Sequence, residues 1–316
     1  MNYLVPEKVE LLRPGRSGSS GGWIGRSETV VWFFKPLSSS TKRRHFMGKL
    51  DKLTTRKSLH TITCALLLSA TYVGVVAAAR ADEADAKKLL RGMSDYVASQ
   101  QAISFNYDAG LEVVTKDDQK LALMSSGNVV LNRPDKVRFT RVGGFADIEG
   151  VFDGKMLTLF GKNAGIYVQA DAPGTFDQLV DALQEKFKRP MPVADLLITN
   201  SYDELMNDVT DIKDLGSGVV GGVECDYLAF RKKEVDFQIW IAQGSKPYPC
   251  RFSITSRAVN GNPQYTIEVR DWRTGSNAEK ADFAFKNPSN ARKVEATEAR
   301  EKLGDLPANF KLGDGK

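Results

Sequence analysis

The sequence predicts an α+β fold in which helices gather on one face of a large, curved antiparallel sheet. Short runs of alternating apolar and polar residues occupy most of residues 105–170 and 210–272, and turn residues separate them. Helical periodicity appears before the first group, at residues 82–101, and between the two groups, at residues 175–207. Helices that stand apart from blocks of strands in this way are typical of a two-layer α+β domain.

Residues 1–81 are predicted to lie outside the folded domain. Residues 47–81 contain a basic region, an apolar run at residues 62–78 and an Ala-Arg-Ala site, the layout of a secretory signal peptide cleaved near Ala81. Met47 is therefore the expected start. Residues 1–46 are interpreted as a mis-assigned, disordered upstream extension, and a genuine long N-terminal extension is the rival interpretation.

The apolar run is also long enough to serve as a membrane anchor, but the small residues at its end favour cleavage. The expected product is a mature form that is soluble and does not span the membrane. It consists of one domain, residues 82–316.

Charge and histidine content exclude several classes of function. The chain has 44 Lys/Arg and 39 Asp/Glu, and residues 1–81 contain 13 of the basic and 4 of the acidic residues. The exported part therefore has 31 basic and 35 acidic residues and is mildly acidic. It lacks the basic surface expected of a nucleic-acid-binding protein. Both histidines, His45 and His60, lie in the removed segment, which excludes histidine-based nucleophilic catalysis and zinc binding in the rest. With no nucleophile elbow, phosphate loop or dinucleotide fingerprint present, we predict no enzyme, catalytic residue, cofactor or metal.

Two cysteines remain in the exported part, Cys225 and Cys250. An exported protein can form disulfides. In the predicted meander, however, one strand separates the two, which places them about two spacings of 4.8 Å apart. That exceeds the limit of about 7 Å between the Cα atoms of a disulfide, so the pattern disfavours a bond unless the loop bends.

The first predicted element is an amphipathic helix at residues 82–101, with acidic residues at its start and an apolar face. The helical region at residues 175–207 starts with an apolar stripe up to Phe187 and is interrupted by Pro190 and Pro192. Two shorter helical pieces are expected after it, at residues 193–200 and 201–208.

The strands precede and follow this insertion. Six are predicted as a meander before it, with tight reversals at Asp-Gly and Asn-Ala-Gly. After it, strands resume near Thr210, and the last four are predicted at residues 224–232, 235–242, 250–257 and 264–272.

Four segments resemble the periplasmic lipoprotein-carrier superfamily with the LolA/LolB-like fold. They are the Arg-Pro turn in "SGNVVLNRPDKVRFT" (126–140), the Asp-Gly-Lys hairpin in "FDGKMLTLF" (152–160), the strand "PQYTIEVRDWRTG" (263–275) and the closing "KADFAFKNPSNARKV" (280–294). Within the superfamily the chain is most similar to an uncharacterised family of predicted periplasmic proteins.

The resemblance implies an unclosed β-barrel, or half-barrel, whose helices cover the concave face and enclose a cavity for acyl chains. It also implies that the arginine of the Arg-Pro turn, here Arg133, holds the helical lid closed. An arginine side chain carries five N–H donors, which suit the backbone carbonyls at helix ends. The insertion at residues 175–207 is longer than in the carrier, which leaves its cargo and partners open for this chain.

The alternation indicates which side chains face inward. If the inner face lines a pocket, the candidate ligand-binding residues are Phe105, Tyr107, Leu111, Leu121, Leu123, Phe139, Phe237, Ile239, Ile241, Phe252, Ile254 and Ile267. The alternative is that these residues pack directly on the helices and leave no cavity.

The functional hypothesis is a periplasmic carrier or binding protein for a lipid, a lipoprotein acyl chain or a similar hydrophobic small molecule. The alternative is a non-catalytic interaction or sensor module with a filled core and an envelope protein as its partner. Trp240 and Trp272 fall on outward positions and would mark the surface of such a module, although cover by neighbouring long side chains is the simpler interpretation. The charged run at residues 231–234 is interpreted as a solvated hairpin tip.

Overall fold

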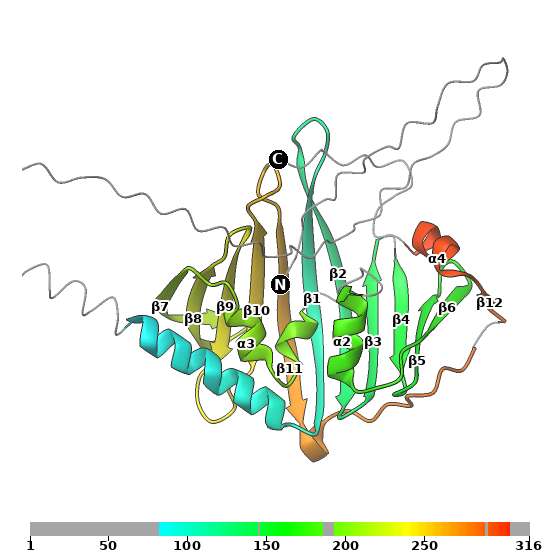
Figure 1. Ribbon diagram of the computed structural model, residues 1–316, viewed down its shortest axis with the longest axis horizontal. Helices are drawn as coiled ribbons and strands as arrows, with labels where there is room; N and C mark the ends of the chain where they lie inside the picture. The colour runs from blue at the N-terminus through cyan, green and yellow to red at the C-terminus, as the bar shows by residue number, and fades with distance from the viewer. Residues whose placement is uncertain (1–81, 145, 186–192, 288–289, 304–316) are drawn as a thin grey trace, which may run out of the picture.

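A single sheet of twelve strands forms the body of the protein (Figure 1). The computed structural model describes residues 82–144, 146–185, 193–287 and 290–303, so the predicted upstream extension and signal peptide lie outside the described residues. The strand order is β12-β6-β5-β4-β3-β2-β1-β11-β10-β9-β8-β7. Neighbouring strands are antiparallel except for β12 and β6, which are parallel.

The strands span the two blocks predicted from the alternation. Those of the first block are β1 (Ala102–Val114), β2 (Lys120–Asn132), β3 (Lys136–Gly143), β4 (Asp147–Phe152), β5 (Met156–Gly161) and β6 (Ile166–Asp171). Those of the second block and the C-terminus are β7 (Asp211–Val220), β8 (Val223–Arg231), β9 (Val235–Ala242), β10 (Pro249–Ser256), β11 (Gln264–Thr274) and β12 (Arg292–Lys293). Since β12 and β7 stand at opposite ends of the order, the sheet is unclosed, as predicted.

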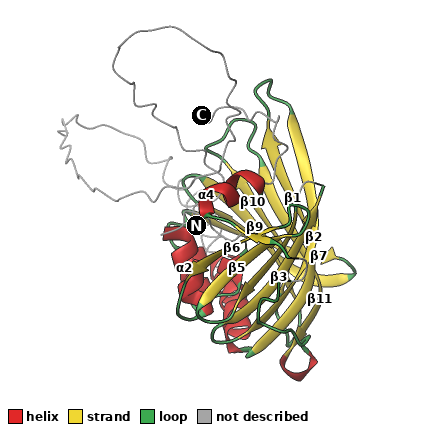
Figure 2. Ribbon diagram, turned by 90° about the vertical axis from the view of Figure 1, so that its right-hand side faces the viewer, coloured by secondary structure: helices red, strands yellow, loops and turns green. Residues whose placement is uncertain are grey.

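Helices cover the concave face of the sheet, which confirms the predicted α+β class (Figure 2). They are the N-terminal helix (residues 82–99), α2 (Phe176–Glu185), the 3-10 helix η1 (Ala194–Leu196) and α3 (Ser201–Met206). We call these four elements the helical cover. Within the described part of the chain, no helix has the length and apolar character needed to cross a membrane.

Two details of the helical regions differ from the prediction. Residues 193–200 form only the short η1, which begins after Val193 in a left-handed conformation at φ 69°. A β-branched residue is strained in that region, so the backbone there is fixed by tertiary contacts. The C-terminus adds the 3-10 helix η2 (Gly275–Asn277) and α4 (Ala296–Lys302), which the patterns do not predict.

Close packing requires a glycine in the "SGNVVLN" motif. Gly127 of β2 pairs with Tyr107 of β1, and the Tyr107 ring crosses above it to donate a hydrogen bond to the Thr140 carbonyl at 2.9 Å. A Cβ at Gly127 would lie 2.0 Å from that carbonyl oxygen and 2.7 Å from the tyrosine hydroxyl. Only glycine leaves room for this link between β1 and β3.

The closing motif runs across the outer, convex face. Phe285 packs against Phe160 of β5 and Tyr167 of β6, with ring centroids 5.9 and 5.0 Å apart. The side chain of Arg138 on β3 donates to the backbone carbonyl of Asp282. Residues 279–285 are thereby fixed to the convex face and leave the concave face to the helical cover.

Candidate hydrophobic binding site

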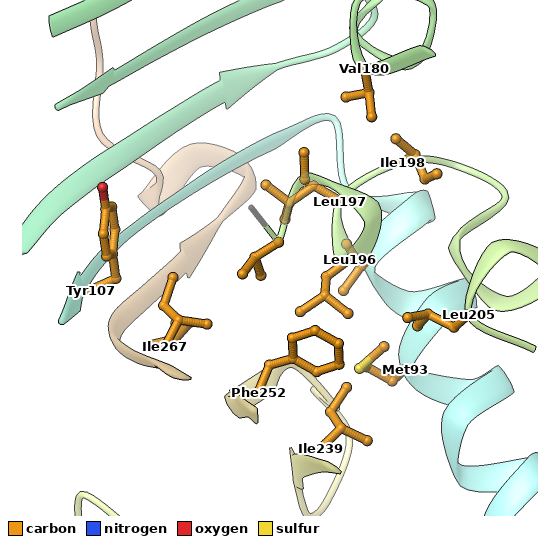
Figure 3. Close-up of a cluster of buried hydrophobic side chains, with 14 of the residues drawn as sticks. Met93, Tyr107, Val180, Leu196, Leu197, Ile198, Leu205, Ile239, Phe252 and Ile267 are labelled. Carbon is orange, nitrogen blue, oxygen red and sulfur yellow. The ribbon is translucent and has the colours of Figure 1, made fainter. Parts of the chain in front are cut away.

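The apolar inner face of the sheet and the apolar sides of the helical cover form one buried cluster. Met93 of the N-terminal helix, Leu196 of η1 and Phe252 of β10 are at most 1% exposed. Figure 3 shows these side chains directed toward one another, with Ile239 of β9 close to Phe252. Side chains of the cover therefore fill the space above the strands at this point, and burial at about 25 cal/mol per Å² of apolar surface holds the two layers together.

The structure brings most of the predicted ligand-binding residues into this cluster. Its buried members are Phe105, Tyr107, Phe237, Ile239, Ile241, Phe252, Ile254 and Ile267, and the partly buried Leu111 and Phe139 pack against it. Leu121 and Leu123 share the same face, since they pair with Val113 and Leu111. They lie half-buried near the start of β2, outside the cluster.

Arg133, in the turn between β2 and β3, contacts several segments of the helical cover. Its Nε donates to the carbonyl of Gln100 at 3.1 Å, and its Nη2 donates to Leu197 at 2.5 Å and to Val97 at 3.5 Å. The end of the N-terminal helix and the end of η1 therefore share one guanidinium, whose fixed planar fork suits several carbonyls at once.

A carboxylate on α2 completes the surroundings of Arg133. Asp177 lies 3.7 Å from Nη1, and the Arg133 side chain is only 9% exposed. Burial lowers the pKa of Arg133, and the Asp177 charge opposes that shift. Asp177 also accepts hydrogen bonds from the backbone N–H and the hydroxyl of Thr199, so it joins α2 to the segment after η1. The sequence offered one local indication of this residue, an acidic side chain in the first turn of a predicted helix, where it is favoured by the helix dipole.

The charged run between β8 and β9 is not wholly solvated, and the prediction is wrong for one of its residues. Lys232 is 6% exposed, whereas its neighbours Arg231 and Lys233 are exposed. Its ammonium lies under the helical cover and donates to the carbonyl of Glu204 in α3 at 3.2 Å. No local signal distinguishes this lysine from its neighbours, because the contact depends on where α3 packs.

The two tryptophans lie on opposite faces. Trp240 is on the convex face as predicted, where Tyr227 stacks on it at 4.3 Å and Arg251 lies 5.4 Å from the ring centroid. Trp272 faces the core instead, with Phe105 and Tyr248 each stacked at 5.3 Å. The reason is a bulge in β11 at Asp271, which has φ 55° and reverses the alternation of the following residue.

Cys225 and Cys250 are free and buried in a small cluster with Val220 and Ala242. Strand β9 separates them, as the sequence predicts, but a bulge at residues 249–251 of β10 brings the thiols near each other. Burial raises the pKa of both thiols, which keeps them protonated and unreactive. Over the described residues, no group of three or more His, Cys, Asp or Glu side chains could hold a metal ion.

A separate cleft of about 290 Å³ opens on the convex face beside residues 279–282. Several of its polar groups are already paired. Arg138 contacts Glu149, which also contacts Lys162 outside the cleft, and the Thr140 hydroxyl donates to Asn128. A ligand would have to displace these internal pairs. The cleft is also on the wrong face and too polar to be the predicted apolar pocket.

Comparison with protein families identifies relatives of the chain. A family model described as "Predicted periplasmic protein (DUF2092)" matches residues 86–297, more than half of the sequence. This match confirms the resemblance to an uncharacterised family of predicted periplasmic proteins and, at the level of the family, the periplasmic location. No curated protein matches the sequence.

Several solved structures match parts of the chain at low identity and low TM-score. The lipoprotein LppX of Mycobacterium tuberculosis is 13% identical with a TM-score of 0.32, and the match covers 62% of this chain and all of that one. LprF of Mycobacterium bovis is 11% identical with a TM-score of 0.39, and the match covers 66% of this chain and 97% of that one. The LolA-superfamily protein NE2245 of Nitrosomonas europaea is 10% identical with a TM-score of 0.28, and the match covers 60% of this chain and 94% of that one. At these TM-scores the likenesses are too distant to carry an argument about function.

Proposed function

Since this chain belongs to the DUF2092 family of predicted periplasmic proteins, we propose that it is a non-catalytic binding protein or carrier for a hydrophobic ligand, such as a lipid or an acyl chain. The ligand would bind between the concave face of the sheet and the helical cover. That interface supplies a continuous apolar surface built from the strands, the N-terminal helix and η1. Apolar walls with a few polar groups are typical of sites for such ligands.

The observation that carries this proposal is the position of Arg133. A nearly buried guanidinium donates to carbonyls at the ends of two cover elements, so a few polar contacts hold the cover at its edge. Because Met93, Leu196 and Phe252 fill the core in this state, a ligand can enter only when the cover moves away from the strands. We propose that breaking the Arg133 contacts is the first step in opening the cover.

The test is ligand uptake by purified protein freed of bound lipid. A fluorescent fatty acid is titrated into wild type, Arg133→Met and the control Arg270→Met, which removes a half-exposed arginine paired with Asp108. We expect saturable binding in wild type and at least several-fold faster uptake in Arg133→Met alone. Absence of binding in all three proteins, together with no lipid in extracts of freshly purified protein, would contradict the proposal.

One observation favours a second function, an interaction module with a permanently filled core. Phe237, Ile239 and Ile254 at the centre of the predicted pocket are fully buried by protein side chains. Such a module would act through its convex face, where Trp240 lies. It predicts a cross-linked envelope protein that is lost in Trp240→Ala, with no effect of fatty acid on melting temperature. Trp272 is unsuitable for this test because it faces the core.

A further inference from the structure

Lys232 is the second polar residue that joins a strand turn to the helical cover. Its ammonium donates to the carbonyl of Glu204 at 3.2 Å, and the Phe237 ring centroid lies 5.9 Å away. Glu204 lies in the last turn of α3, where backbone carbonyls have no partner within the helix. A lysine there donates to this carbonyl and complements the negative end of the helix dipole.

The turn that carries Lys232 is itself held firmly. The Lys232 amide donates to the Val235 carbonyl at 2.8 Å, and Arg257 donates to the Lys232 carbonyl at 3.0 Å. The Arg257 amide also donates to the Glu234 carbonyl at 2.8 Å. These bonds fix the lysine backbone to the sheet, so its contact with Glu204 positions α3 relative to the strands.

Lys232 and Arg133 lie at opposite ends of the strands. Five pairings separate β2 from β8, through β1, β11, β10 and β9, and all five are antiparallel. An odd number of antiparallel steps makes β2 and β8 run in opposite directions. The turn after β2 and the turn after β8 therefore lie at opposite ends of the strands, in different halves of the sheet.

The cover elements between these two turns are connected. Arg91 of the N-terminal helix lies 3.5 Å from the Tyr202 ring centroid of α3 and 3.6 Å from the Asp203 carboxylate. A chain of contacts thus runs from Arg133 through the N-terminal helix to α3 and ends at Lys232. Release at one end of the strands leaves the cover held at the other end.

We propose that Lys232 is a second latch of the helical cover, which holds α3 at the end of the strands opposite Arg133, so that full opening requires release at both ends. The latch gains its importance from the proposed ligand site, on which this inference rests. Burial lowers the pKa of Lys232, while the carboxylates of Glu204, Asp195 and Asp208 oppose that shift.

The test is amide hydrogen exchange on protein purified after export of the full chain. Lys232→Met is compared with Lys233→Met, which removes an exposed charge from the same turn. We expect exchange in α3 to rise about tenfold or more in Lys232→Met, with little change at the end of the N-terminal helix. Arg133→Met should show the reverse pattern, and the double variant should take up a fluorescent fatty acid faster than either single variant.

Two outcomes would overturn the latch. One is equal exchange of α3 in Lys232→Met and Lys233→Met. The other is an increase spread evenly over all strands with a lower unfolding midpoint, which would show a purely structural role. If α3 alone is released but no variant binds fatty acid, the latch stands and the proposed ligand function fails.

Discussion

Replacing Arg133 with methionine should destabilise the protein, because the methionine fills part of the space but donates no hydrogen bond. Two carbonyls lose a well-placed donor, that of Gln100 at 3.1 Å and that of Leu197 at 2.5 Å. Leaving a buried acceptor unpaired costs about 1–3 kcal/mol. Removing a buried charge returns some of its desolvation cost, so we expect a net loss of about 3 kcal/mol in the free energy of unfolding.

For a domain of this size, each kcal/mol shifts Tm by roughly 2–4 °C, which predicts a Tm about 6–12 °C below wild type. The assay is thermal unfolding followed by circular dichroism. Arg270→Met is the control, and its half-exposed ion pair with Asp108 should contribute less than about 1 kcal/mol. A Tm of Arg133→Met within about 2 °C of this control would refute the reasoning, because the carbonyls would then need no donor from Arg133.

Three further predictions concern the core and its surroundings. Burial raises the pKa of Tyr107 to about 12, so its contribution to stability is complete below pH 10 and is lost as the pH rises toward 12. In urea unfolding between pH 9 and 12, the free energy of unfolding should fall less steeply with pH in Tyr107→Phe than in wild type. An equal dependence on pH in the two proteins would contradict this. Phe252→Ala should lower the unfolding free energy by about 3–5 kcal/mol, against less than about 0.5 kcal/mol for Val142→Ala, since Val142 is 50% exposed; equal losses would argue against a packed core. Cys225 and Cys250 should react with a thiol reagent only in denaturant, because both are buried with raised pKa values, and rapid labelling of folded protein would show that the cluster opens.

The local patterns predicted much of the architecture. Alternation located strands in both blocks and separated inner residues such as Phe237 and Ile239 from outer ones such as Trp240. The period-2 rule depends only on the extended backbone, so it holds wherever a strand is regular. It failed at Trp272, where the bulge at Asp271 inserts an extra residue.

Other features depend on segments that are far apart in the sequence. Lys232 lies in a charged run that predicts a solvent-exposed turn, yet it is buried because α3 packs over it. The role of Arg133 was implied by resemblance, but its partners at Val97, Gln100 and Leu197 are visible only in the folded chain. Contacts of this kind have no local signal, because they are set by how the cover docks on the sheet.

Sequence alone predicts the class of the fold, the facing of regular strands and the absence of histidine chemistry from residues 82–316. These properties follow from composition and from the periods of helix and strand. Only the folded chain shows that Met93 and Leu196 fill the inner face in this state, and that Arg133 and Lys232 donate hydrogen bonds to the cover at opposite ends of the strands. Packing and hydrogen bonding between distant segments set both, since each depends on the relative position of the helices and the sheet.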